Sequence, residues 1–208
     1  MDFRYHYTDE QEAFRTEVRD YLSANIPEDM RSPVDARLSL TQEQYKFWRV
    51  MHQQLAAKGW MYPTYPAEYG GGGLSGDHET IIMEEFERAG VVRDFTNALC
   101  LPTLMVWANE EQKHQFLTPL LKCEKVAFQN FSEPEAGSDL ASLQSRAERD
   151  GDDWIITGTK TWVSGHGEPD WLFGPIVTDQ DAPRHRNLGY FMVPSPAEGL
   201  SIQRLDLL

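Results

Sequence analysis

The stretch from Thr118 to Phe131, TPLLKCEKVAFQNF, is where the hydrophobic period of the sequence changes. Up to Lys122, apolar residues recur every three or four positions, the spacing that gives a helix one apolar face. Beyond Lys125 the period falls towards two, and β-branched and aromatic residues gather in short runs typical of strands. We therefore predict an α+β chain in which an N-terminal all-helical bundle, residues 1–124, precedes an antiparallel β-barrel domain, residues 125–208.

Helix starts and stops in the first half follow capping chemistry. Three polar pairs have the spacing of a capping box: Thr8 with Gln11, Thr41 with Gln44, and Asn109 with Gln112. A proline or a glycine follows the apolar repeat of the first three segments, where a helix is expected to end. These signals predict five helices: from Thr8 to before Pro27, from Thr41 to Gly59, from near Asp77 to Gly90, over Leu101–Ala108, and from Asn109 to Leu121.

Seven short runs in the second half predict strands. They are Val126–Phe131, Gln144–Glu148, Trp154–Thr157, Thr161–Ser164, Trp171–Val177, Leu188–Val193 and Leu200–Leu208. Asp150-Gly151 predicts a hairpin turn, because this pair readily adopts positive φ. Pro175 predicts an edge strand or a bulge, because proline has no N–H for a sheet. The last run stops without a turn or a polar tail. We expect either that it is tucked into the sheet or that the sequence is part of a longer chain.

Composition excludes several classes of function. With 19 Lys and Arg against 33 Asp and Glu, the net charge is −14 and the isoelectric point is near 4.8. This charge disfavours nucleic acids and anionic membranes, although a local basic pocket for a phosphorylated ligand stays possible. Cys100 and Cys123 are too few for a disulfide framework and lack metal-binding spacing. The sequence has no export leader and no transmembrane run, so we expect a reduced, cytoplasmic protein without a metal.

Several other motifs have ordinary structural explanations. Gly71 to Gly76, GGGLSG, matches the dinucleotide fingerprint, but the proline-containing residues before it cannot form the required strand. We interpret it as a flexible loop between helices. The six histidines show no metal-binding spacing, and Ser164 with His166 lacks the context of a hydrolase nucleophile. The adjacent Glu84 and Glu85 are interpreted as part of a solvated helix face.

Two segments of the second half have the ingredients of a ligand site. Residues 131–139, FSEPEAGSD, leave a predicted strand, turn at a proline, and offer a Gly-Ser pair that can approach an anion closely. Residues 160–165, KTWVSG, add hydroxyl groups and a large aromatic side chain. A planar aromatic ligand needs a stacking surface and a few donors at its edge, and the two segments together supply both. Each segment alone is also explained as an ordinary barrel turn.

The same segments carry a family resemblance. Residues 132–139, SEPEAGSD, and 157–164, TGTKTWVS, resemble in sequence and in order the middle-domain signatures of the flavin-dependent acyl-CoA dehydrogenases. The helical half is similar to that family at residues 66–71, PAEYGG, at Glu84-Glu85, and at residues 110–113, EEQK. The resemblance covers the whole chain and implies a helical domain followed by a β-barrel domain that holds FAD.

What the resemblance implies for individual residues is specific. Ser132 would bond the pyrimidine edge of the flavin, Trp162 would lie beside the isoalloxazine, and Ser164 would lie near its N5. Ser138 would meet the pyrophosphate or the acyl-CoA. The implied cofactor-binding residues are Gln129, Phe131, Ser132, Gly137, Ser138, Trp162, Val163 and Ser164. A hydroxyl donor at N5 or O2 stabilises the negative charge of reduced flavin, which is the protein's share of this chemistry.

The implied reaction is α,β-dehydrogenation of an acyl-CoA thioester, in which a carboxylate removes the α-proton and hydride passes from the β-carbon to the flavin. The family's catalytic glutamate lies in a C-terminal helical bundle that this sequence does not contain. We therefore assign no catalytic residue and expect little or no turnover by these 208 residues. Ser138 and Arg184 are our candidates for contacts with acyl-CoA. Arg184 belongs to a basic run, Arg184-His185-Arg186, that could meet CoA phosphates or simply be a solvated loop.

The resemblance also implies partners. They are an electron-transfer flavoprotein or similar acceptor and, for the full-length protein, further copies in a homo-oligomer with a role in fatty acid or lipid catabolism. Two alternatives stay open: a non-catalytic flavin-binding partner subunit, and a flavin oxidase or monooxygenase of the same fold. Gln129 and Glu135 depart from the residues common in the family, an aromatic and a small residue, and this bears on how the flavin would pack.

Overall fold

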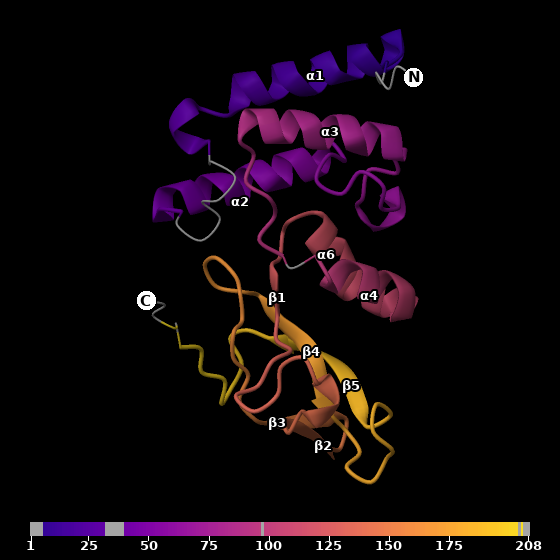
Figure 1. Cartoon of the computed structure of the whole chain (residues 1–208), viewed down its shortest axis with the longest axis vertical. Helices are drawn as coiled ribbons and strands as arrows, with labels where there is room; N and C mark the ends of the chain where they lie inside the picture. The colour runs from indigo at the N-terminus through magenta and orange to yellow at the C-terminus, as the bar shows by residue number, and fades with distance from the viewer. Residues whose placement is uncertain (1–5, 32–39, 97, 204, 206–208) are drawn as a thin grey trace. The chain divides into compact units, whose positions relative to one another are not determined.

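A computed structural model of the chain describes residues 6–31, 40–96, 98–203 and 205 (Figure 1). These residues divide into two compact units. One is drawn from residues 1–94 and 101–124, and the other from residues 95–100 and 125–208. In the described part of the chain, no helix is both long and apolar enough to cross a membrane. A helical region followed by a β-rich region confirms the main outline of the predicted fold class.

The helices lie where capping chemistry predicts them. They are α1 (Asp9–Asn25), α2 (Gln42–Ala57), α3 (Gly76–Ala89), α4 (Cys100–Trp107), α5 (Glu110–Gln112) and α6 (Thr118–Leu121), with a π-helical turn at Lys113–Leu117 between the last two. All three predicted capping boxes are present. Gly59 and Gly90 have φ values of 75° and 65°, which confirms that each supplies the left-handed residue at a helix end.

The helical unit contains a buried ion-pair cluster between α1 and α3. Glu85 is only 2% exposed, and its carboxylate lies 3.0 Å from Arg15, 2.9 Å from Arg19 and 3.2 Å from Arg88. Arg15 is itself buried and also lies 2.6 Å from Glu84. The interpretation of the two glutamates as a solvated face is therefore wrong for Glu85. The nearby arginines make its burial possible, because a buried charge is tolerated only when it is paired.

The described residues of the β unit form one sheet of five strands. They are β1 (Ala127–Gln129), β2 (Arg146–Asp150), β3 (Asp153–Thr157), β4 (Trp171–Val177) and β5 (Leu188–Pro194). The central strand is β4: β5 pairs with one of its edges, antiparallel, and β1 and β2 both pair with the other edge, parallel. The hairpin of β2 and β3 turns at Asp150-Gly151 as predicted, with Gly151 at a φ of 64°.

The prediction of an antiparallel barrel is wrong. The sheet formed by the described residues is open, and the β1–β4 and β2–β4 pairings are parallel. The physical reason lies in the long connections before β4, because only a tight turn forces neighbouring strands to be antiparallel. Residues 161–164 do not form the predicted strand, and neither do residues 200–203 or 205. The rest of the last predicted strand, residues 204 and 206–208, lies outside the described residues.

Pro175 lies in the central strand β4, not at an edge or a bulge as predicted. On one edge of β4, β1 pairs with residues up to Phe173, and β2 pairs with Val177. Pro175 lies between these two positions, so its missing N–H interrupts no ladder bond with either strand. The sheet thus has a gap between β1 and β2 on this edge of β4, and the proline fits there.

Candidate functional site

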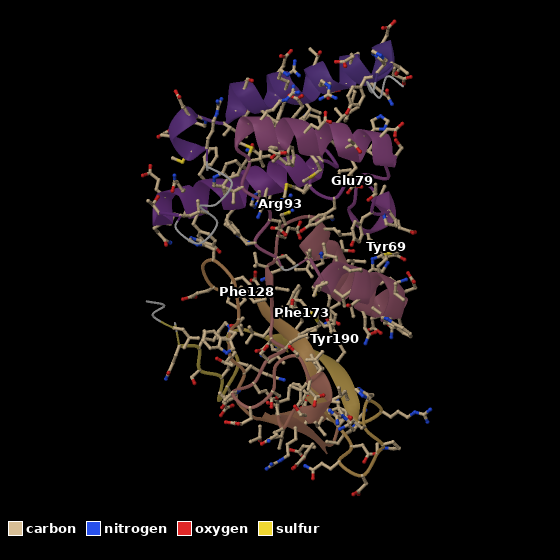
Figure 2. The ribbon with its side chains drawn as sticks, in the orientation of Figure 1. Tyr69, Glu79, Arg93, Phe128, Phe173 and Tyr190 are labelled. Atoms are coloured by element: carbon tan, nitrogen blue, oxygen red, sulfur yellow. The ribbon has the colours of Figure 1, made fainter. Side chains whose placement is uncertain are left out.

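The first signature segment leaves the sheet at the end of β1. The N–H of Asn130 donates to the Phe173 carbonyl at 2.7 Å, and the Phe131 ring packs edge-to-face on the Phe173 ring. A side chain at Gly174 would place its Cβ 2.4 Å from the Asn130 carbonyl oxygen, so only glycine fits beside this exit. Figure 2 labels Phe128, Phe173 and Tyr190, which lie on β1, β4 and β5.

After this exit the chain makes a tight turn. Glu133 and Ala136 exchange two backbone hydrogen bonds, at 2.7 and 3.1 Å. Both residues are buried, whereas Gly137 and Ser138 beyond them are exposed. In the described part of the chain, no atom other than those of Gly137 and its two chain neighbours lies within 4 Å of the place where a Cβ at Gly137 would stand. The segment therefore presents an open backbone surface where the sequence predicts close approach of a ligand.

The second signature segment is attached directly to the first. The Thr161 N–H donates to the Ser132 carbonyl at 2.9 Å. Trp162 follows at a φ of 57°, a conformation that a bulky residue rarely adopts, and 68% of its surface is exposed. At the far end, a Cβ on Gly165 would lie 2.2 Å from the Phe128 ring, so the backbone here packs on that ring. Residues 162–164 are thus exposed between two fixed points.

A buried ion pair joins the two signature segments. Lys160 Nζ lies 2.9 Å from Glu133 Oε1, and the two side chains are 9% and 5% exposed. The same ammonium donates to the carbonyls of Phe131, at 3.2 Å, and Pro175, at 3.0 Å. The Glu133 carboxylate also accepts from the N–H groups of Gln144 and Ser145, at 2.7 and 3.0 Å. Four stretches of chain therefore meet at this pair.

Environment shifts the pKa of both partners downward. Burial lowers the pKa of the Lys160 ammonium, and the neighbouring Glu133 carboxylate opposes that shift. Burial by itself would raise the pKa of Glu133, but hydrogen bonds from Ser145, Gln144 and Lys160 outweigh it and the pKa is lowered. Glu133 is therefore held as a carboxylate whose oxygens are already engaged.

The predicted acyl-CoA residues lie around a second contact. Arg184, in the loop between β4 and β5, forms an ion pair with Asp139, the residue after Ser138. Both charged side chains are more than half exposed. The Arg184 guanidinium lowers the pKa of Asp139. Among the described residues, Ser132 contacts Thr161 and Arg184 contacts Asp139. No described side-chain contact links the first of these pairs to the second.

Sequence profiles of known families match both halves of the chain. The acyl-CoA dehydrogenase N-terminal domain matches residues 8–124, and the acyl-CoA dehydrogenase middle domain matches residues 129–207. The chain belongs to the acyl-CoA dehydrogenase family. This confirms the resemblance drawn from the two signatures. The family is flavin-dependent and acts in lipid catabolism, so membership of it supports the expectation of an oxidoreductase.

Individual family members agree with this assignment. Acyl-CoA dehydrogenase IpdE1 of Mycobacterium tuberculosis is 35% identical over 196 residues, which are 92% of this chain and 51% of that protein. The solved Tcur3481–Tcur3483 steroid ACAD matches with a TM-score of 0.78 and 34% identity, over 96% of this chain and 50% of that one. The ChsE4–ChsE5 complex from Mycobacterium tuberculosis matches with a TM-score of 0.74 and 31% identity, over 95% and 49%. The chain thus spans about half the length of these relatives.

Sequence reasoning missed the most buried part of this candidate site. Glu133 and Lys160 were predicted only as parts of the two signatures, without a role of their own. The need for a glycine at position 165, next to the Phe128 ring, was not predicted. One signal was available: Lys160 is the one charged residue of its signature, and the other signature contains three acidic residues, Glu133, Glu135 and Asp139. Charged residues are rarely buried unless they are paired, so a buried lysine would need one of these acids.

The glycine-rich loop of the helical unit lacks the structure of a dinucleotide-binding loop. A short 3₁₀ turn, Ala67–Tyr69, precedes it in place of a strand. Added Cβ atoms at Gly71 and Gly72 would lie 2.3 Å from the carbonyl oxygens of Tyr65 and Gly59. The loop is therefore closely packed rather than flexible, and its N–H groups at residues 70–73 already donate to carbonyl groups. A cavity of about 460 Å³ adjoins it, but these amides cannot turn to an anion there.

Neither metal nor disulfide chemistry has support within the described residues. Among the residues that the structure describes, no group of three or more His, Cys, Asp or Glu side chains lies close enough to hold a metal ion. Cys100 and Cys123 are both buried free thiols. Burial raises the pKa of Cys100 to about 12, which keeps this thiol protonated and unreactive.

Proposed function

We propose that this chain supplies the flavin-binding half of an acyl-CoA dehydrogenase that carries out FAD-dependent α,β-dehydrogenation of an acyl-CoA thioester. The observation that carries the proposal is the bond from the Thr161 N–H to the Ser132 carbonyl. It joins the two family signatures into one surface, although the two bonded residues are 29 positions apart in sequence.

The residues of this surface have the chemistry that FAD requires. Trp162 and Val163 offer exposed apolar faces to a planar ring. Ser132 and Ser164 offer hydroxyl groups for its polar edge. Gly137 and Ser138 offer an open backbone and a hydroxyl group for the pyrophosphate. Gln129, the last residue of β1, and Phe131, two residues beyond it, complete the proposed set.

When bound, FAD supplies the acceptor for the hydride that leaves the β-carbon of the substrate. This chain's own residues bind and orient: the Ser164 and Ser132 hydroxyls stabilise negative charge on the ring, and Trp162 fixes its plane. Ser138 and Arg184 meet the acyl-CoA. An anionic phosphate is a natural partner for the Arg184 guanidinium. Such a phosphate would compete with the Asp139 carboxylate for this guanidinium.

We infer that Glu84, Glu85 and Glu133 do not remove the α-proton. The carboxylates of Glu84, Glu85 and Glu133 are bonded to arginine or lysine, and the pKa of each is lowered. A carboxylate with a lowered pKa and engaged oxygens is a poor general base. We therefore infer that the base comes from a part of the protein absent from this sequence, or from a second chain.

A second chain is favoured by one observation. The ChsE4–ChsE5 structure, which is 31% identical to this chain, is a complex of two differently named proteins. We infer that a related chain pairs with this one and that electrons then pass to an electron-transfer flavoprotein or similar acceptor. In that case this chain contributes the flavin surface and its partner contributes the base.

Titration of the purified chain with FAD tests the proposal. We expect saturable binding, seen as a shifted visible spectrum of the flavin. Ser132→Ala and Ser164→Ala should each weaken binding by about three- to tenfold, the value of one hydrogen bond. Ser201→Ala, a change at an exposed serine of the same unit, is the matched control and should leave the affinity unchanged.

The second arm adds acyl-CoA without oxygen. The chain alone should keep its oxidised flavin spectrum, and addition of the base-bearing chain should bleach it. Absence of saturable FAD binding would overturn the proposal. Turnover by the isolated chain would overturn the assignment of the base elsewhere, and rapid peroxide formation would identify an oxidase instead.

A further inference from the structure

The gap in the sheet beside Pro175 is filled by the Lys160 side chain. In a strand the N–H and C=O of one residue point to the same edge, so the Pro175 carbonyl faces the gap. Among the described residues no strand pairs with it there, since β1 ends at Gln129 and β2 begins at Arg146. Lys160 Nζ donates to this carbonyl at 3.0 Å and takes the place of a strand donor.

The Glu133 carboxylate completes the connection across the gap. It pairs with Lys160 on one side and accepts the N–H groups of Gln144 and Ser145, just before β2, on the other. Lys160 also donates to the Phe131 carbonyl, just after β1. The pair therefore fixes the end of β1, the start of β2 and the middle of β4 relative to one another.

The segment that follows Lys160 needs such support. Trp162 has a φ of 57°, and strained backbone of this kind persists only when the surroundings hold it. Its exposed ring contributes little burial of its own. Support comes from the neighbours: Lys160 and Thr161 are held by the first signature, and Gly165 packs on the Phe128 ring.

We propose that Lys160 and Glu133 form a positioning pair that holds residues 162–164 in the conformation that binds FAD. The pair acts through the backbone and not by touching the cofactor, because both charged groups are nine-tenths buried beneath the exposed segment. This role rests on the proposed function, since it presupposes that FAD binds this surface.

A double variant separates positioning from general stability. Lys160→Met leaves the buried Glu133 carboxylate without its counter-charge, so the thermal midpoint should fall. The combined Lys160→Met/Glu133→Gln variant removes both charges and should recover much of that midpoint. If the pair positions the segment, FAD should still bind the double variant at least tenfold more weakly, with a reduced circular dichroism signal of the bound flavin.

Lys125→Met is the matched control. Lys125 pairs with Asp170 at 2.8 Å in the same unit and belongs to neither signature segment, so its loss should leave the FAD affinity unchanged. Wild-type affinity in the double variant would overturn the positioning role alone. Absence of FAD binding by the wild-type chain would overturn the proposed function, and this role with it.

A measurement on the unmodified chain covers the case in which the variants do not fold. Amide exchange of Thr161, whose N–H donates to Ser132, should be slow in the FAD-free protein if the segment is already held. Exchange as fast as in an unstructured peptide would overturn the proposal. Slow exchange at Thr161 would support it, because the conformation then exists before the ligand arrives.

Discussion

At the scale of single residues, Trp162 has a backbone conformation that costs stability, at a position where the proposed function needs an exposed aromatic ring. A non-glycine residue in the left-handed region costs roughly 1–2 kcal/mol, and an exposed ring does not recover that cost through burial. Neighbouring hydrogen bonds and the packing of Gly165 hold the conformation. Strain kept at an exposed aromatic residue is typical of a binding site, because no folding advantage explains it.

Trp162→Gly tests this separation of stability and binding. Glycine adopts positive φ freely, so the free energy of unfolding should change by less than about 1 kcal/mol. FAD affinity should fall by about tenfold or more with the loss of the aromatic face. Urea unfolding and FAD titration measure the two effects. Trp162→Phe keeps an aromatic ring and should keep most of the affinity; equal losses in both variants would contradict the proposed contact.

Glu85 is the second residue whose surroundings decide its role. Glu85→Gln removes the counter-charge of three arginines, one of them almost fully buried. We expect the free energy of unfolding to fall by about 3 kcal/mol or more, as when one partner of a buried ion pair is removed. Glu87→Gln, an exposed position on the same helix, should change it by less than about 0.5 kcal/mol. Similar urea midpoints for the two variants would refute the importance of the cluster.

At the scale of elements, local chemistry was predictable and long-range pairing was not. The helix caps at Thr8, Thr41 and Asn109 were foreseen because a cap involves residues only three positions apart. The β2–β3 hairpin was foreseen for the same reason. The parallel pairings of β4 were missed, because the sequence alone does not state which distant strands become neighbours.

The same distinction applies to the candidate site. The family signatures pointed to Ser132 and Trp162 as separate candidates, and each lies in a recognisable local motif. The contact between their segments, and the ion pair of Glu133 with Lys160 beneath them, depends on chain separations of more than twenty residues. Pro175 illustrates the point in the sheet. Its chemistry was understood correctly, but the gap that accommodates it exists only in three dimensions.

Two glycines in these elements should respond differently to the same substitution. Gly174→Ala would place a methyl group 2.4 Å from the Asn130 carbonyl oxygen and force β1 away from β4. We expect a loss of about 1–3 kcal/mol in the free energy of unfolding, as for other overpacked sites. Gly137→Ala would meet no atom of the described residues within 4 Å beyond its own chain neighbours, so it should leave stability unchanged while weakening FAD binding. Thermal unfolding and FAD titration of both variants check this, and a reversed order would contradict the assignment.

At the scale of the whole molecule, the net charge of −14 does not describe the environment of individual carboxylates. Each unit contains a glutamate that is buried and paired: Glu85 in the helical unit and Glu133 in the β unit. Their neighbours are cations or N–H donors, so both are held as anions inside an acidic protein. Net charge governs long-range attraction, whereas these sites are set by contacts within a few ångströms.

Both glutamates therefore link stability to pH in the same direction. Hydrogen bonding to Arg19 lowers the pKa of Glu85, and the pKa of Glu133 is lowered by its donors despite burial. A carboxyl whose pKa is lower when folded stabilises the protein fully above its unfolded value of about 4.3, and loses this contribution as pH falls through the folded value. We expect the free energy of unfolding, measured by urea titration between neutral and acidic pH, to fall below about pH 4.5. Glu85→Gln and Glu133→Gln should each flatten that decline, and Glu87→Gln should keep the wild-type slope. An unchanged slope in both buried variants would show that other groups control acid unfolding.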